Sequence, residues 1–226
     1  EMPAIIGSER NIVDIIFTNK PADLNALKNC KFGNTTVAEE LTQFIAKIGE
    51  NIQIRRFDII ESNQDEIIGQ YIHAGGKIGV LLKLQLSDIS KKETGDVKEL
   101  LKDLCMQVAA AEPKYISSKD VTQEDLDNER AVYTQQMRNE GKPEKIIANI
   151  VEGKIKKYYE LVCLEDQLFI KDQNIKVNKV IEEVSKKSGI SIKVTQFVRY
   201  KVGEGIEKKK VDFAAEVQAQ LSASSK

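Results

Sequence analysis

The stretch from Ile67 to Leu86 constrains the fold of this chain more than any other part of its sequence. It holds two runs rich in apolar and β-branched residues, separated by a glycine-rich segment, 74–79, that reads Ala-Gly-Gly-Lys-Ile-Gly. Such runs are typical of strands, and glycine adopts the backbone angles that a tight turn requires. We therefore predict two antiparallel strands joined at a sharp corner, with the only histidine of the chain, His73, at that corner.

The regions on either side of this pair predict a mixture of helices and strands. The isoleucine-rich segment 51–60 favours a strand that joins the pair in a three-stranded meander. A second isolated strand is predicted over 191–202, and an extended segment over 166–172. Apolar residues that recur every three or four positions predict amphipathic helices over 2–17, 37–48, 97–111, 177–188 and 207–221.

Residues 116–164 differ in character from the rest of the chain. The first half is mostly charged and polar, and its apolar residues Leu126, Tyr133 and Met137 form only a narrow seam. Gly141 and Pro143 then predict the end of one helix and the start of the next. We expect an antiparallel helical hairpin that projects from the body of the protein.

The overall composition excludes several classes of protein. The chain has 226 residues with 34 basic and 35 acidic side chains, which argues against nucleic acid as the main ligand. No apolar run approaches the length of a membrane span, and the start does not resemble a signal peptide. The three cysteines are far apart in the sequence and form no Cys-x-x-Cys motif, so we expect buried thiols and neither a disulfide framework nor a zinc site.

Catalytic machinery is not visible in the sequence. There is no phosphate-binding loop and no dinucleotide fingerprint, and His73 has no nucleophile as a companion. We therefore interpret the chain as an α+β binding protein without covalent chemistry. A weak internal similarity is also present: arginine stands next to an aromatic residue in two segments, 54–57 and 198–200, as expected if the chain contained two related α+β halves.

Eight short motifs, in one order along the chain, resemble the elongation factor Ts family, the nucleotide-exchange factors of elongation factor Tu. Each motif is weak alone, but the ordered series is specific. The motifs lie at Ile48–Ile52 with Arg55-Arg56, Tyr71–Leu81, Val108–Ala111, Gly141–Pro143, Val151–Lys154, Gln167–Asp172, Phe197–Tyr200 with Val202–Lys208, and Asp212–Val217.

This resemblance implies an α+β fold made of two related subdomains, each with a three-stranded antiparallel sheet and helices. A coiled-coil-like hairpin is inserted in the second subdomain, and a helical module ends the chain. The implied boundaries are 1–66 for the first subdomain, 67–115 with 165–207 for the second, 116–164 for the hairpin and 208–226 for the C-terminal module. The family's N-terminal helical module and its Thr-Asp-Phe-Val motif have no counterpart here, so we expect a fragment of a longer protein.

The resemblance also implies a partner and a set of contact residues. The implied partner is elongation factor Tu, and a protein of this family promotes GDP release by binding the nucleotide-free state of that partner. No cofactor, metal, membrane or direct nucleic-acid contact is expected. Location in the cytoplasm, or in an organelle of bacterial type, follows from the same family. Two alternatives stay open, an RNA- or ribosome-associated binding protein that uses the hairpin, and self-association through the hairpin. The implied partner-binding residues are Ile48, Gly49, Glu50, Asn51, His73, Gly75, Val211 and Phe213.

Overall fold

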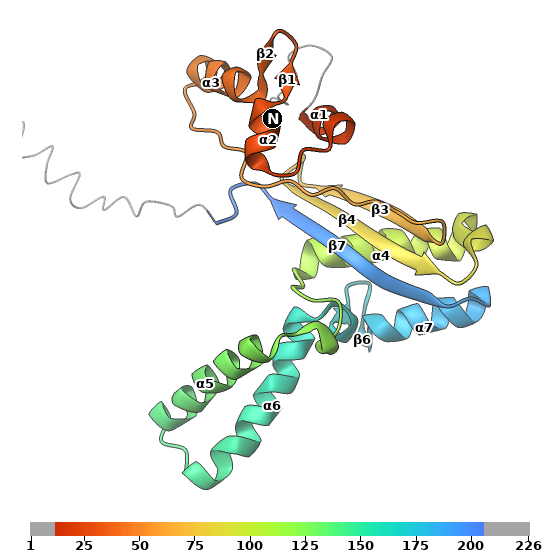
Figure 1. The fold of residues 1–226 in the computed structure, drawn as a ribbon. Coiled ribbons are helices and arrows are strands. Elements are labelled where there is room, and N and C mark those ends of the chain that lie inside the picture. Colours follow the sequence, from red (N-terminus) through yellow and green to blue (C-terminus); the bar gives the residue numbers. More distant parts are fainter. Residues whose placement is uncertain (1–11, 206–226) are drawn as a thin grey trace, which may run out of the picture.

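A three-stranded antiparallel sheet forms the centre of the computed structural model, which describes residues 12–205 (Figure 1). The sheet has the order β3–β4–β7. Helices α4 and α7 cover one face of the sheet, so the fold is α+β, as the sequence predicts. The bounds of these elements are Glu66–His73 (β3), Ile78–Leu86 (β4), Gly95–Ala111 (α4), Val177–Ser188 (α7) and Ile192–Lys201 (β7).

The predicted strand pair around the glycine corner is confirmed, but the strand predicted over 51–60 is wrong. Strands β3 and β4 pair in register from Glu66 opposite Gln85 to His73 opposite Ile78. The other edge of β4 pairs with β7, which comes from far along the chain, and residues 51–63 form neither helix nor strand. Isoleucine favours an extended backbone, but a strand also requires a hydrogen-bonded neighbour, which this segment lacks among the described residues.

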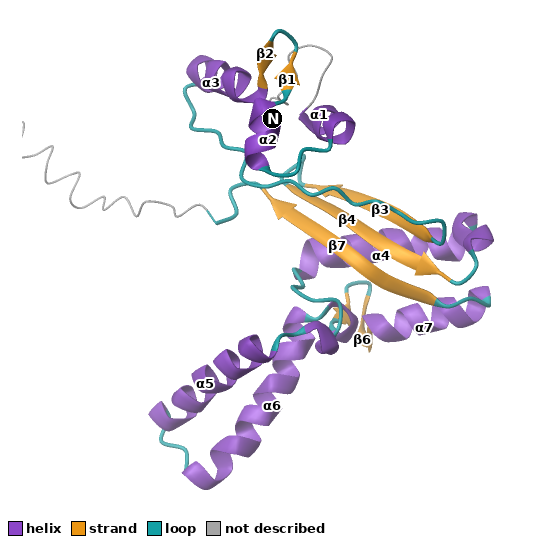
Figure 2. Cartoon of the chain, in the orientation of Figure 1, coloured by secondary structure: helices purple, strands orange, loops and turns teal. Residues whose placement is uncertain are grey.

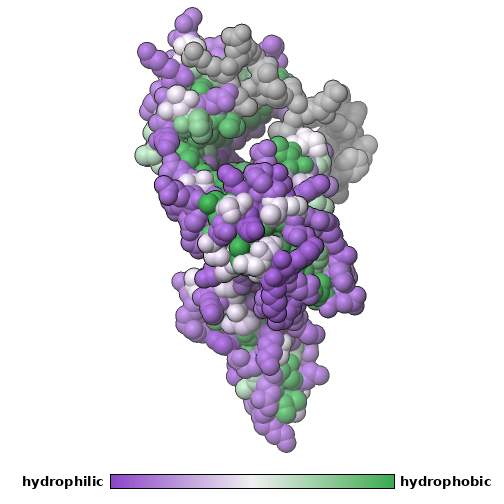
Figure 3. Space-filling model, turned by 90° about the vertical axis from the view of Figure 1, so that its right-hand side faces the viewer, coloured by the Kyte–Doolittle hydropathy of each residue, from purple (hydrophilic) through white to green (hydrophobic). Residues whose placement is uncertain are grey.

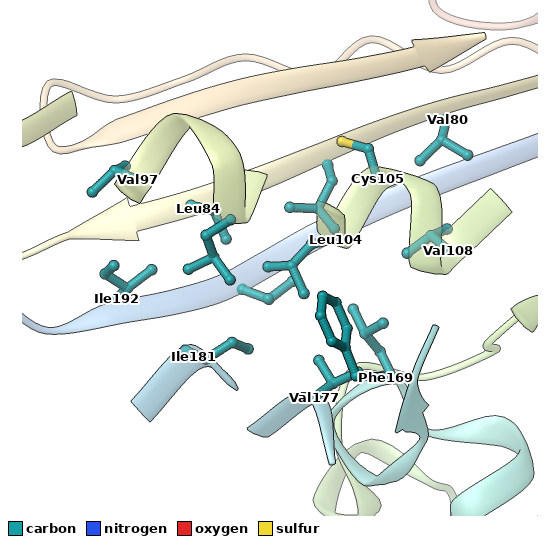
Figure 4. Packing of buried hydrophobic residues seen from close by; sticks show 14 of the residues in the cluster. Val80, Leu84, Val97, Leu104, Cys105, Val108, Phe169, Val177, Ile181 and Ile192 are labelled. Carbon is teal, nitrogen blue, oxygen red and sulfur yellow. The ribbon is translucent and has the colours of Figure 1, made fainter. Parts of the chain in front are cut away.

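The main core lies between the sheet and helix α4 (Figure 4). Alternate residues of β4 point into it, as expected for a strand with one buried face, and the apolar stripe of α4 packs against them. Gly69 of β3 permits the close approach, because a Cβ atom built there would lie 2.6 Å from Cγ of Leu101. The most deeply buried apolar side chains of β4 and α4 are Leu82, Leu84, Leu86, Val97, Leu104, Cys105 and Val108.

A smaller unit precedes the sheet, with its own hydrophobic cluster of Ile15, Leu27, Phe32 and Val37. Helix α3 begins with a capping box, in which the Thr36 hydroxyl accepts a hydrogen bond from the Glu39 amide and the Glu39 carboxylate accepts one from the Thr36 amide. The elements of this N-terminal unit are Ile12–Asn19 (α1), Leu24–Asn29 (α2), Lys31–Phe32 (β1), Thr35–Thr36 (β2) and Val37–Ile48 (α3). The helix predicted over 2–17 corresponds in part to α1, and its first ten residues lie outside the described residues.

The predicted helical hairpin is confirmed as α5 (Gln123–Asn139) and α6 (Glu144–Val162), which project from the body of the protein (Figure 1). Thr122 caps α5 by accepting a hydrogen bond from the Asp125 amide. The seam between the two helices is a separate cluster that includes Leu126, Met137 and Ile147. In the space-filling view, hydrophobic residues also reach the surface along the hairpin (Figure 3).

Two buried glutamines join the base of the hairpin to the core. Gln107 of α4 donates a hydrogen bond from Nε2 to Oε1 of Gln167 at 3.1 Å and one to the Leu168 carbonyl, and its Oε1 accepts one from the Ile170 amide. Nε2 of Gln167 donates to the carbonyls of Ala111 and Leu161 at the ends of α4 and α6. The network therefore fixes where the hairpin leaves the core. Short elements complete the chain: Ile89–Glu93 (η1), Ser118–Asp120 (η2), Leu164–Asp166 (η3), Leu168–Phe169 (β5) and Asp172–Lys176 (β6).

Within residues 12–205, three hydrophobic clusters thus lie in separate parts of the chain. We propose that they mark three units, which correspond to the first subdomain (1–66), the second subdomain (67–115 with 165–207) and the hairpin (116–164). The fourth expected unit, residues 208–226, lies outside the described residues.

The three cysteines differ in accessibility, which predicts their reactivity. Cys105 and Cys163 are fully buried, and burial raises the pKa of each thiol to about 12. Cys30 is only half-buried, and its thiol donates a hydrogen bond to the Ala26 carbonyl. Because the thiolate is the reactive form, we expect Ellman's reagent to modify Cys30 alone in the folded protein and all three thiols after unfolding. A Cys30→Ser variant should lose the fast reaction; fast modification of a second thiol in that variant would contradict the burial of the other two.

Candidate partner-binding site

The corner between β3 and β4 has the tight geometry that its glycines predict. Three consecutive residues have positive φ angles, Ala74 at 52°, Gly75 at 64° and Gly76 at 90°. Glycine adopts such angles without strain, whereas a side chain at these positions disfavours them. The corner is closed on its other side because the Val202 amide donates a hydrogen bond to the Lys77 carbonyl at 2.9 Å. This hydrogen bond connects the corner to the end of β7 at one end of the sheet.

His73 is exposed beside this corner and is held by Tyr71. The Tyr71 hydroxyl and His73 Nδ1 are 3.0 Å apart, and the two rings are stacked with centroids 5.9 Å apart. Next to them lies a cavity of about 370 Å³, which is lined mainly by apolar side chains. An imidazole with a fixed orientation beside an apolar hollow suits contact with another molecule. The lining residues are Tyr71, His73, Ile78, Met106, Ala109, Ala110, Glu112 and Ile170.

The second predicted contact segment, Ile48–Asn51, follows the end of helix α3. Gly49 ends that helix with a left-handed φ of 78°, and its amide donates to the Ile45 carbonyl. Ile48 is half-buried, whereas Gly49, Glu50 and Asn51 are exposed. The turn thus presents an apolar side chain flanked by polar groups on the surface of the N-terminal unit.

A network of charged and aromatic groups connects the segment after this turn to the end of β7. The Arg56 guanidinium lies over the Tyr200 ring, 4.5 Å from its centroid, and is 2.7 Å from Oε2 of Glu204. Arg55 donates a hydrogen bond to the Glu204 carbonyl, and the Tyr200 hydroxyl donates one to Asp58. Burial and this hydrogen bond raise the pKa of the Tyr200 hydroxyl.

The structure brings some of the predicted contact residues to the same end of the sheet. His73 and Gly75 lie at the corner, and the segment that follows Ile48–Asn51 contacts the end of β7 beside that corner. Val211 and Phe213 lie outside the described residues. Sequence reasoning did not assign Arg55, Arg56, Asp58, Tyr200 and Glu204 to one site. The sequence did show the same pairing of arginine with an aromatic residue in the segments 54–57 and 198–200. In the fold these two segments contact each other through Arg56 and Tyr200.

The described residues contain neither a cluster that could hold a metal ion nor a helix that could span a membrane. Within residues 12–205 no three His, Cys, Asp or Glu side chains are grouped so that they could hold a metal ion. No helix in the same range is long and apolar enough to cross a membrane.

Comparison with known proteins identifies the family of this chain. A model of the family Elongation factor TS matches residues 7–204. The protein named Elongation factor Ts from Clostridium acetobutylicum is 46% identical to this chain, and the match covers 85% of the chain and 61% of that protein. The protein of the same name from Clostridium novyi is 44% identical, and the match covers 94% of the chain and 69% of that protein. Another, from Clostridium perfringens, is 48% identical over 82% of the chain and 59% of the relative.

The described fold is that of an α+β protein, and the chain belongs to the elongation factor Ts family. It is therefore related to translation elongation factors that act in protein biosynthesis. The matched region spans 61% of the length of the Clostridium acetobutylicum relative, so the chain corresponds to about three fifths of that protein.

Proposed function

We propose that this chain binds the nucleotide-free state of elongation factor Tu and thereby promotes release of GDP. Membership of the elongation factor Ts family is the observation that carries this proposal. The exposed Ile48–Asn51 turn and the exposed His73 corner support it as two surfaces that one partner could contact, because the segment 55–58 after the turn contacts the end of β7 beside that corner.

The proposed mechanism needs no covalent step. A factor that binds the nucleotide-free partner more tightly than the GDP-bound partner weakens GDP binding by the ratio of those two affinities. In this view the Ile48 side chain is buried against the GTPase domain of the partner, and His73 supplies a polar contact of fixed orientation. The chain then acts as an exchange factor through binding energy alone and is not an enzyme in the covalent sense.

We expect Ile48→Asp and His73→Ala each to weaken binding to nucleotide-free elongation factor Tu by about ten-fold or more, which corresponds to about 1.4 kcal/mol. Aspartate would place a charge in a contact that excludes water, and alanine would remove the oriented imidazole. Isothermal titration calorimetry of each purified variant measures the change, with circular dichroism as the check of folding.

Val132→Asp provides a matched control, because Val132 is a β-branched helical residue that is 51% exposed on the hairpin. The affinity of the Val132→Asp variant for nucleotide-free elongation factor Tu should equal that of the unaltered chain. Unchanged affinity in both Ile48→Asp and His73→Ala would show that these residues are not the contact site. Failure of the unaltered chain to bind elongation factor Tu would overturn the proposed function itself.

A further inference from the structure

The connection between helix α3 and strand β3 is long for a compact fold. Residues 49–65 contain no helix or strand (Figure 2). Connections of this length without secondary structure are uncommon and usually mobile unless side chains hold them. The extensive packing between helices and strands also lies either within the N-terminal unit or within the rest of the protein. The orientation of the N-terminal unit therefore depends on contacts made by the connection.

One part of this connection has two faces. Ile54 and Phe57 pack against the hydrophobic cluster of the N-terminal unit. Arg55, Arg56 and Asp58 instead contact the end of β7 and the turn that follows it. The segment 54–58 is thus attached to the N-terminal unit by its apolar side chains and to the sheet by its charged ones.

The contacts on the sheet side converge on Tyr200 and Glu204. Arg56 stacks on the Tyr200 ring and pairs with the Glu204 carboxylate at 2.7 Å. A planar guanidinium can make both contacts at once, whereas a lysine ammonium could not stack on the ring in the same way. Two directional contacts fix both the distance and the angle between the segment and the strand.

Further contacts hold the end of β7 on which this contact is made. Arg199, next to Tyr200, has a side chain that is only 7% exposed, and it pairs with Glu112 just beyond the end of α4. Its Nε also donates to the Ala109 carbonyl at 3.3 Å. Both Ala109 and Glu112 line the cavity beside His73. The same strand end therefore connects the 54–58 segment to the surroundings of the His73 corner.

We propose that Arg56, stacked on Tyr200, is a positioning residue that holds the Ile48–Asn51 turn at a fixed place relative to the His73 corner. This inference rests on the proposed function, because it matters for binding only if one partner contacts both surfaces. Without the stack, the N-terminal unit samples several orientations on its long connection, and only a fraction of them presents both surfaces together. The apparent affinity falls by that fraction.

Double electron–electron resonance, which measures the distances between two spin labels on one molecule, tests the inference without the partner. Nitroxide labels at Gln43→Cys on α3 and Lys193→Cys on β7, both exposed positions, report the orientation of the N-terminal unit, with Cys30 replaced by serine. We expect a narrow distance distribution for the labelled parent and a clearly broader one for Arg56→Ala. Tyr200→Phe keeps the ring and removes the bond to Asp58, so it should broaden the distribution less than Tyr200→Leu.

Arg138→Ala is the matched control. Arg138 pairs with Glu144 at 2.7 Å, and its side chain is 51% exposed, compared with 2.7 Å and 55% for Arg56 paired with Glu204. Loss of this hairpin ion pair should leave the distance distribution unchanged. A distribution as narrow in Arg56→Ala as in the parent would overturn the proposal, whatever the affinity.

Affinity for nucleotide-free elongation factor Tu gives the second readout. If about one fifth of the Arg56→Ala molecules retain the competent orientation, the affinity falls about five-fold, while Arg138→Ala binds as the parent does. Broader distances with unchanged affinity would overturn the positioning role in binding. If the parent chain does not bind at all, the proposed function fails, and the distance measurement still decides whether Arg56 positions the unit.

Discussion

Replacement of Leu104 by alanine is expected to lower the free energy of unfolding by about 3–4 kcal/mol. Leu104 is fully buried at the centre of α4, where it faces Leu84 of the sheet (Figure 4). The substitution removes apolar surface that was buried and leaves a cavity which the surrounding helices and strands can fill only in part. Urea denaturation followed by circular dichroism measures the change.

Leu161→Ala is the control for the Leu104 prediction. Leu161 is also a helical leucine, but it is 68% exposed on α6. The same change of side chain should alter the free energy of unfolding by no more than about 0.5 kcal/mol, because little surface is buried at this position. Equal effects at the two positions would contradict the assignment of α4 to the core.

Replacement of Gln107 by leucine is expected to destabilise the protein by about 2–4 kcal/mol, although leucine has a similar size and is more apolar. The Gln107 side chain is fully buried, and its loss leaves the Ile170 amide, the Leu168 carbonyl and Oε1 of Gln167 without this partner. Buried polar groups that lose a hydrogen bond keep the cost of their desolvation. The loss of stability should therefore exceed the loss caused by replacing an exposed glutamine with leucine.

Two measurements distinguish this effect from a general loss of packing. Gln135→Leu, at an exposed position of α5, should change stability by no more than about 0.5 kcal/mol. Hydrogen exchange of the Ile170 amide should become faster in Gln107→Leu, because that amide donates to the Gln107 side chain at 2.8 Å. An unchanged exchange rate at Ile170 would show that the network does not hold the base of the hairpin in solution.

Local sequence signals predicted those elements whose structure depends on nearby residues. The helix at 37–48 carries its own capping box and its own terminating glycine, so its bounds could be read directly. The β3–β4 pair is likewise a local hairpin whose turn residues determine where the chain reverses. The same holds for the arms of hairpin α5–α6, where Thr122 and the segment 141–143 mark the helix ends.

Pairings between distant segments could not be read from the sequence. The segment 51–60 and strand β7 have similar β-branched composition, yet only β7 joins the sheet, on the second edge of β4, and 51–60 does not pair with the outer edge of β3. The pattern alone does not state which extended segments find a hydrogen-bonded neighbour in the sheet. For the same reason the internal similarity of arginine and aromatic residues was visible, but the contact between Arg56 and Tyr200 was not.

The sequence by itself therefore determined the secondary structure of its locally capped elements, the absence of a recognisable catalytic motif and, through its ordered motifs, the family. Only the tertiary structure decided the neighbours of β4 and the contact of segment 54–58 with the end of the sheet. It also showed that the glycine corner and the end of β7 lie together at one end of the sheet. The physical reason is that caps, turns and amphipathic periods act within a few residues. Contacts between distant segments depend instead on which surfaces the completed fold leaves available.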